Sequence, residues 1–271
     1  LQDRPTYRSS CTVEFTDYTN ALSAPKHISQ AGLFPANCRL LDSNEALFNG
    51  AGDGSKHLLM IAFESADHDK SHSLKRALEI VEDNEGIFEE PKELKDAHRS
   101  GSSGSWRSSF IKAPYLRESF TRRGIIQDTF ETAITWDKSH KFIENIKEET
   151  AKAILEITGK PSLVTCRITH SYPDGLAPYF TFGAFSTPQS MIEIWKEIKL
   201  ATNEICIKNQ GTVTHHHAVG RDHRPKGYDD QRPDLFNKVL VAAKSSLDPK
   251  GIMNPGVLID PEGKNISNWM A

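Results

Sequence analysis

Three consecutive histidines, His215, His216 and His217, are the most reactive group of side chains in the sequence. They lie in the His- and Arg-rich segment Gly211–Tyr228, which we expect to be irregular. In an extended chain alternate side chains share a face, so His215 and His217 would lie together and His216 opposite them. Imidazoles titrate near neutral pH, so this group is suited to acid–base chemistry or to binding an anion or an electron-rich cofactor.

Two other interpretations of the histidines stay open. Two neutral imidazoles without a nearby carboxylate make an incomplete zinc site, so we expect no metal here. A solvated histidine loop would have the same sequence. The residues that follow form a local cationic cluster suited to a phosphate or carboxylate, although a solvated loop would again look similar; they are Arg221, His223, Arg224 and Lys226.

A hairpin provides the second candidate site. Strands are predicted over Leu163–Ser171 and Pro178–Phe185, joined by a turn at 172–175 in which proline presets φ and glycine takes a positive φ. If the aromatic residues of the second strand face the core, Arg167 and Tyr179 emerge together on the other face. That pair fits an anion clamp beside a proton donor or acceptor, and an ordinary exposed pair is the competing interpretation.

The elements that must position these residues alternate between strand and helix patterns. Further strands are predicted over Ser10–Phe15, Asn37–Leu41, Leu58–Glu64 and Gly124–Ile134, and helices over Asp17–Gln30, Lys70–Asn84, from an N-cap at Asp137, around Met191–Ile205, and over Leu235–Leu247. The Gly/Ser-rich stretch Ser100–Ser109 is predicted to be a loop. No internal repeat shows at a fixed period. The central hairpin favours an α+β fold, a ferredoxin-like antiparallel sheet with helices packed on one face, over a doubly wound parallel sheet.

Composition excludes several classes of protein. At about 150 residues per domain, 271 residues make ~1.8 domains. The net charge of −3 and the lack of basic blocks argue against a nucleic-acid partner. The longest apolar run, Leu58–Phe63, is far shorter than the ~20 residues of a membrane span. The four dispersed cysteines indicate free thiols. Because Leu1 is not a methionine, we expect the sequence to belong to a longer chain.

Several stretches point together to one family. They are Phe34–Asp42, Asp128–Asp137, Thr165–Tyr172, Tyr179–Phe182, Gly211–Gly220 and Leu247–Gly256. With them the chain resembles the C-terminal half of the alkyldihydroxyacetonephosphate (alkylglycerone-phosphate) synthases, flavoenzymes of the vanillyl-alcohol-oxidase group of FAD-linked oxidases. The last stretch is similar across FAD-linked oxidases, whereas F-E-T-x-x-x-W-D and T-H-H-H are more specific to the synthases.

The resemblance implies an activity and a set of roles. The synthases use FAD to exchange the acyl group of acyl-dihydroxyacetone phosphate for a fatty alcohol in ether-lipid synthesis. By position, Tyr179 resembles their acid–base tyrosine, and His215, His216 and His217 their active-site histidines. The resemblance also implies substrate binding by Arg117, Arg167, Thr132 and Trp136, and contact with the cofactor by His216, His217 and Asn254.

The resemblance also implies an organisation into parts. We expect residues 1–210 to be a substrate-binding cap domain, and residues 211–271 to be the His-rich loop and a tail returning to the FAD-binding domain of the same parent chain. That domain is absent from the sequence, so we do not expect this part alone to retain FAD or to be active. Ala218 stands where the synthases usually have glycine.

We expect two kinds of substrate and keep two competing functions open. The expected substrate is a phosphorylated lipid or a small hydroxy acid, and a homodimer is left open. A bacterial protein would be cytoplasmic and a eukaryotic synthase peroxisomal. The alternative enzyme is an FAD-linked oxidase or dehydrogenase of a 2-hydroxy acid such as lactate or glycolate. The alternative outside enzymes is a standalone binding module.

Overall fold

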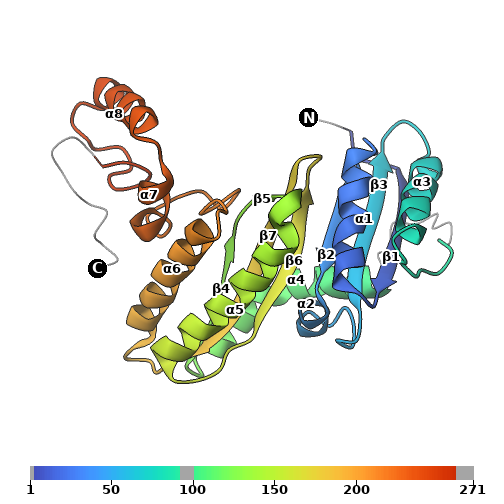
Figure 1. Ribbon diagram of the computed structural model, residues 1–271, viewed down its shortest axis with the longest axis horizontal. Helices are drawn as coiled ribbons and strands as arrows, with labels where there is room; N and C mark the ends of the chain where they lie inside the picture. The colour runs from blue at the N-terminus through green and yellow to red at the C-terminus, as the bar shows by residue number, and fades with distance from the viewer. Residues whose placement is uncertain (1–2, 92–100, 261–271) are drawn as a thin grey trace.

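A single antiparallel sheet runs through the protein (Figure 1). The computed structural model describes residues 3–91 and 101–260. The strands are β1 (Tyr7–Phe15), β2 (Asn37–Leu41), β3 (His57–Ser65), β4 (Ile125–Glu131), β5 (Ile134–Thr135), β6 (Val164–Ser171) and β7 (Gly175–Phe185). The α-helices are α1 (Tyr18–Gln30), α2 (Ser43–Phe48), α3 (Ser71–Glu82), α4 (Gly101–Thr121), α5 (Ser139–Thr158), α6 (Met191–Lys208), α7 (Asp229–Gln231) and α8 (Asp234–Leu247).

The sheet is built from two halves with the same topology. Its strand order is β1-β3-β2-β6-β7-β4, with β5 beside β7. The first half runs β1, α1, β2, β3, α3 and the second runs β4, α5, β6, β7, α6. The equivalent strands β2 and β6 meet in the middle, where Leu40 pairs with Ile168 and Leu41 with Arg167. The repeat that the sequence does not show is therefore present in the topology.

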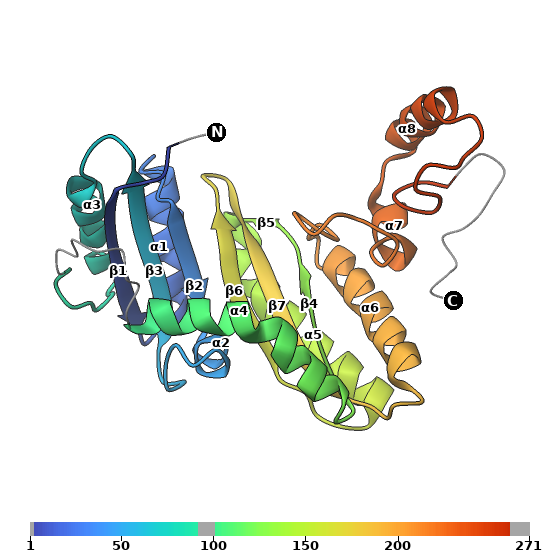
Figure 2. The same cartoon turned by 180° about the vertical axis from the view of Figure 1, so that it is seen from behind.

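Strand alternation separates an apolar face from a polar one. Helices α1, α3, α5 and α6 cover the apolar face (Figure 1), where Cys166, Phe180 and Phe182 are fully or almost fully buried. Arg167 and Tyr179 pair across β6 and β7 and lie on the opposite face, as predicted. The antiparallel α+β prediction is confirmed, with one difference. Helix α4 crosses the second face (Figure 2), so helices lie on both faces.

Two local predictions were wrong. The stretch predicted as a loop is helical from Gly101 onward, because propensity is a weak prior that tertiary contacts override. One such contact is the hydroxyl of Ser109, which donates to the carbonyl of Asn49 at 2.6 Å. Asp137 is not the N-cap of α5. It lies in a short 3-10 turn, and the helix begins at Ser139, whose hydroxyl donates to the carbonyl of Trp136.

The segment after α6 leaves the sheet and carries its own tethers (Figure 1). Arg224 is 3% exposed, pairs with Asp229 and Asp260, and donates to the carbonyl of Gly256. Two more arginines bind carbonyls of the same tail: Arg221 that of Pro255, and Arg232 that of Leu258. Arg221 and Arg224, the two arginines of the predicted cationic cluster, therefore bind the chain's own tail. The four cysteines are unpaired, as predicted. Among the described residues, no helix is both long and apolar enough to cross a bilayer.

The aromatic layer of the core gives a stability prediction. Phe180 is 0% exposed and stacks on Phe130 with ring centroids 5.1 Å apart. Phe180→Ala should lower the free energy of unfolding by about 3–5 kcal/mol, through lost burial and the cavity left behind. Chemical denaturation measures this loss. Phe185→Ala on the same strand, where the ring is 46% exposed, should cost less than about 1 kcal/mol. Equal losses in the two variants would contradict the assigned core.

Candidate functional site

The buried carboxylate of Glu131 organises the histidine loop. Glu131 ends β4, is 0% exposed, and pairs with Tyr179 across the sheet. Its Oε1 accepts hydrogen bonds from the backbone amides of His215, His216 and His217, at 2.6, 2.6 and 2.8 Å. The hydroxyl of Thr214 donates to the same oxygen at 2.6 Å. Three successive amides around one anion fix the backbone of the loop. They therefore also fix the positions from which the three imidazole side chains extend.

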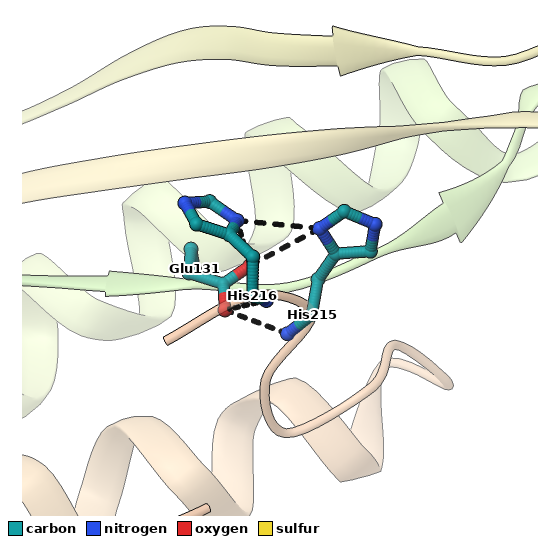
Figure 3. Close-up of side chains that lie close together, drawn as sticks. All are labelled: Glu131, His215 and His216. Atoms are coloured by element: carbon teal, nitrogen blue, oxygen red, sulfur yellow. Dashed lines mark hydrogen bonds and ion pairs between the residues drawn. The ribbon is translucent and has the colours of Figure 1, made fainter. Parts of the chain in front are cut away.

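The imidazoles lie over the end of the central hairpin. The ring of His216 stacks on that of His170, with centroids 4.9 Å apart, and the ring of His217 meets that of Tyr179 edge-on at 5.0 Å. Nε2 of His215 lies 3.2 Å from the hydroxyl of Tyr172. Figure 3 shows the rings of His215 and His216 beside the carboxylate of Glu131. Segments far apart in sequence thus form one cluster of rings.

Arg167 and Tyr179 form the cationic side of this cluster. The guanidinium carbon of Arg167 lies 3.7 Å from the ring centroid of Tyr179, which is a close cation–π contact. Arg167 also donates to Oε1 of the fully buried Glu45 at 2.5 Å, and Glu45 binds the hydroxyl of Thr165 through its other oxygen. The hydroxyl of Tyr179 donates to Oγ1 of Thr129 at 2.9 Å. Arg167 is therefore oriented by a residue of the other half of the sheet.

Hydrogen bonding favours the charged form of Glu131, and burial favours the neutral form of two of the rings. Burial alone would raise the pKa of Glu131, but hydrogen bonds from Thr214 and the three loop amides lower the pKa overall. Burial lowers the pKa of His217, against the opposing effect of Glu131. Burial, followed by the neighbouring His215 and His216, lowers the pKa of His170. A neutral imidazole offers both a donor and an acceptor nitrogen, which suits a ligand-binding surface.

The base of the loop is tightly packed. A Cβ at Gly211 would lie 2.5 Å from the ring of Phe142 and 2.8 Å from Oγ1 of Thr132. Thr132 is 0% exposed and donates to the carbonyl of Thr212, so it supports the loop from beneath. Ala218, just after the histidines, has a φ of +65°, a left-handed conformation that favours glycine. A glycine at this position would adopt the same backbone conformation without a steric penalty.

The structure brings together only some of the predicted site residues. Arg167, Tyr179 and the three histidines form one cluster. Trp136 is 8% exposed in the core and donates its indole N–H to the carbonyl of Tyr172, and Thr132 is fully buried, so both side chains lie beneath the surface of the ring cluster. Arg117 is exposed on α4, and Asn254 is exposed in the tail with a φ of +47°. Within the part of the chain that the structure describes, neither contacts the ring cluster.

Sequence reasoning missed the residues that orient the site. Glu131 stands inside the F-E-T-x-x-x-W-D stretch, yet only the pairing of β4 with β7 places it beside Tyr179. Glu45 has no local signal, because its partner Arg167 is more than a hundred positions away. His170 lies near the end of β6 and Tyr172 follows that strand. Strict alternation would put both on the core face with Cys166 and Ile168. Only the bulge between Ile168 and His170 pairs His170 with Ala177, on the face of Tyr179, and the sequence gives no signal for that bulge.

Comparison with known proteins identifies the family. A model of the FAD linked oxidases, C-terminal domain, matches residues 4–258. The chain belongs to this family. The alkyldihydroxyacetonephosphate synthase of Dictyostelium discoideum is 26% identical over 263 residues, covering 90% of this chain and 43% of that protein. The Caenorhabditis elegans synthase is 33% identical over 159 residues, covering 57% of this chain and 26% of that protein. This FAD-linked oxidase domain therefore spans less than half the length of either relative.

Solved structures share the fold. An alkyldihydroxyacetonephosphate synthase superposes with a TM-score of 0.67 at 19% identity, over 94% of this chain and 45% of its own. A 4-ethylphenol oxidase from Gulosibacter chungangensis superposes with a TM-score of 0.65 at 12% identity, over 97% of this chain and 55% of its own. The resemblance drawn from the sequence to FAD-linked oxidases of this group is thus confirmed.

The packing beneath the histidines gives a prediction for this FAD-linked oxidase domain. Gly211→Ala should displace the loop, because the new Cβ would overlap Phe142 and Thr132. We expect a loss of about 1–3 kcal/mol in the free energy of unfolding and altered NMR signals from the three imidazoles. Gly183→Ala is the matched control, because open space surrounds that position. Unchanged imidazole signals in Gly211→Ala would contradict this packing.

A buried histidine beyond the loop gives a prediction for pH dependence. His223 lies 3.2 Å from Oδ1 of Asn203, and burial, followed by the charge of Lys199, lowers its pKa from 6.5 to about 4. Between pH 6.5 and about pH 4, His223 is protonated in the unfolded chain but stays neutral in the folded protein. The free energy of unfolding should therefore fall below pH 6.5, by about 2 kcal/mol at pH 5.

Denaturation at pH 7 and pH 5 measures this linkage. His223→Asn keeps a donor toward Asn203 and removes the titration, so its stability should depend less on pH than that of the wild type. His72→Asn, at an exposed histidine of α3, should retain the wild-type slope. The linkage is wrong if His223→Asn and the wild type lose the same stability between these two pH values.

Proposed function

We propose that this domain is the substrate-binding part of an FAD-dependent enzyme that exchanges the acyl group of acyl-dihydroxyacetone phosphate for a fatty alcohol, the first step that fixes an ether bond in a lipid. The observation that carries the proposal is the cluster of Arg167, Tyr179 and the Glu131-bound histidine loop on one face of the sheet. The similarity to synthases from several organisms supports it.

The cluster suits a phosphorylated ketone. Arg167 places a delocalised positive charge at the site, and Glu45 holds its guanidinium in a fixed direction. A fixed guanidinium binds two phosphate oxygens at once. Tyr179 donates to Thr129 and keeps its oxygen lone pairs, so its hydroxyl can relay a proton from a substrate C–H beside a ketone. For the phenol oxygen to take the substrate proton, the hydroxyl proton of Tyr179 must turn from Thr129 to another acceptor, and the neighbouring imidazole of His217 would receive it.

An apolar cavity on the same face suits the alkyl chain. It has a volume of about 150 Å³ between α4, α2 and the sheet. Thr165 and Thr181 line it, each two residues along its strand from Arg167 or Tyr179, so the cavity continues the polar cluster. The other lining residues are Phe48, Phe120, Ile125, Gln127, Leu163, Phe182 and Gly183. A charged site beside an apolar cavity fits an amphipathic substrate better than lactate or glycolate.

The residues of the loop also fit a flavin. His216 and His217 present ring nitrogens at an accessible surface, and a flavin ring offers carbonyl and nitrogen partners to such groups. When bound, FAD supplies an electron-accepting ring beside the substrate. In this proposal His216 and His217 contact the cofactor, while Arg167 and Tyr179 bind and deprotonate the substrate. The FAD-binding domain of the parent chain would hold the rest of the cofactor.

Two assays on the full-length FAD-loaded protein distinguish this function from the alternative. In the first, the protein receives acyl-dihydroxyacetone phosphate and a fatty alcohol, and ether product is measured by mass spectrometry. In the second, it receives D- or L-lactate or glycolate with a dye acceptor, and dye reduction is followed. We expect ether product and no dye reduction. Dye reduction without ether product would show that the protein is a 2-hydroxy-acid dehydrogenase.

The role of Tyr179 is tested by removing one oxygen atom. Tyr179→Phe keeps the ring under Arg167 but cannot move a proton, so product formation should fall at least about 100-fold. The flavin absorbance of the purified protein should not change. Tyr7→Phe, at a partly exposed tyrosine of β1, should keep wild-type turnover. Near-normal turnover in Tyr179→Phe would exclude Tyr179 as the acid–base group.

A further inference from the structure

One oxygen of Glu131 has no hydrogen-bond partner. Oε1 accepts four hydrogen bonds, whereas Oε2 is buried and accepts none. An unsatisfied charged oxygen in a buried position is costly, so its surroundings need an explanation. The atoms that face Oε2 are Nδ1 of His216 at 3.2 Å and Nδ1 of His215 at 3.8 Å (Figure 3).

These three atoms converge as metal ligands do. The two Nδ1 atoms lie 3.2 Å apart, so all three separations fall between 3.2 and 3.8 Å. Atoms bound tetrahedrally at about 2.0–2.1 Å from a zinc ion lie roughly 3.3–3.4 Å from one another. Two imidazoles and one carboxylate are also a donor set that zinc uses, with a fourth position left open. Glu131 thus supplies the carboxylate that the two histidines alone lack as a zinc site.

We propose that Glu131, His215 and His216 bind one divalent transition-metal ion of the zinc type. The ion would neutralise Oε2 of Glu131 and accept a lone pair from each Nδ1. The proposal does not depend on the transferase reaction, because it concerns only these three side chains. It changes the interpretation of the three histidines, two of which become ligands while His217 remains free to contact cofactor or substrate.

The surroundings of the three ligands match those of a built site. The hydroxyl of Tyr172 lies 3.2 Å from Nε2 of His215, and an oxygen that accepts the outer N–H of a ligating histidine leaves Nδ1 free for the metal. His170 stacks on His216 and limits its rotation. The side chains of His215 and His216 are 23% and 35% exposed, so the fourth position would be open to water or to an oxygen of an anionic ligand.

The proposal is tested on the full-length FAD-loaded protein after treatment with a chelator. Titration with zinc chloride in a calorimeter should give one site per chain. Metal analysis after dialysis should give the same stoichiometry. Glu131→Gln and His216→Ala should each weaken zinc binding at least about 100-fold, because a lost ligand costs more than the roughly 10- to 100-fold of a lost outer partner. His217→Ala, in the same loop, should bind zinc as the wild type does.

Circular dichroism and flavin absorbance of each variant establish that it is folded. If Glu131→Gln does not fold, His216→Ala with the His217→Ala control decides alone. The proposal is overturned if the wild type takes up no stoichiometric zinc, which would leave an ion pair between His216 and Glu131 only. It is also overturned if His217→Ala loses as much affinity as His216→Ala, since binding would then come from loosely placed imidazoles.

Discussion

The contact of one buried carboxylate with three consecutive backbone amides governs the site. Glu131 lies at the end of β4, the last strand in the order of the sheet, yet it is fully buried, and its Oε1 binds the amides of the three histidines. A charged acceptor makes hydrogen bonds about twice as strong as a neutral one, and a buried charge tolerates no loss of its donors. If the histidine loop moved away from the sheet, the carboxylate of Glu131 would lose its hydrogen-bond donors and remain buried as an uncompensated charge. The same carboxylate leaves one oxygen directed at two imidazoles, which makes it the centre of both the loop and the proposed metal site.

The duplicated topology explains how the cationic side of the site is made. Strands β2 and β6 are equivalent elements of the two halves and meet along a short seam. Glu45 follows β2 in the first half and fixes Arg167 of the second. Asp42, also beside the seam, binds the amide of Cys166 and the ammonium group of Lys147. Buried acids from one half thus orient groups of the other, so the site requires both halves of the sheet.

The sequence predicted what depends on local pattern. Alternation along the hairpin placed Arg167 and Tyr179 on one face, and the resemblance drew attention to the histidines. Prediction from the sequence failed where the partner of a residue is distant along the chain. Glu131 and Glu45 act only through pairing between strands, and a lone carboxylate in a strand has no signature of its own. Trp136 and Thr132 are buried, and the motif that drew attention to them does not show which of its side chains turn into the core. The Gly/Ser-rich start of α4 is helical although its residues have low helix propensity. Propensity alone is a weak predictor of secondary structure, because tertiary contacts override it.

Glu131 holds the histidine loop through its amides, and hydrogen exchange measures those amides directly. We predict that the amides of His215, His216 and His217 exchange slowly in the wild type although their side chains are accessible. In Glu131→Ala all three should exchange at the rate of an open loop, while the amide of Phe180 in the core stays protected. Fast exchange at the three histidines in the wild type, or unchanged protection in Glu131→Ala, would contradict the account.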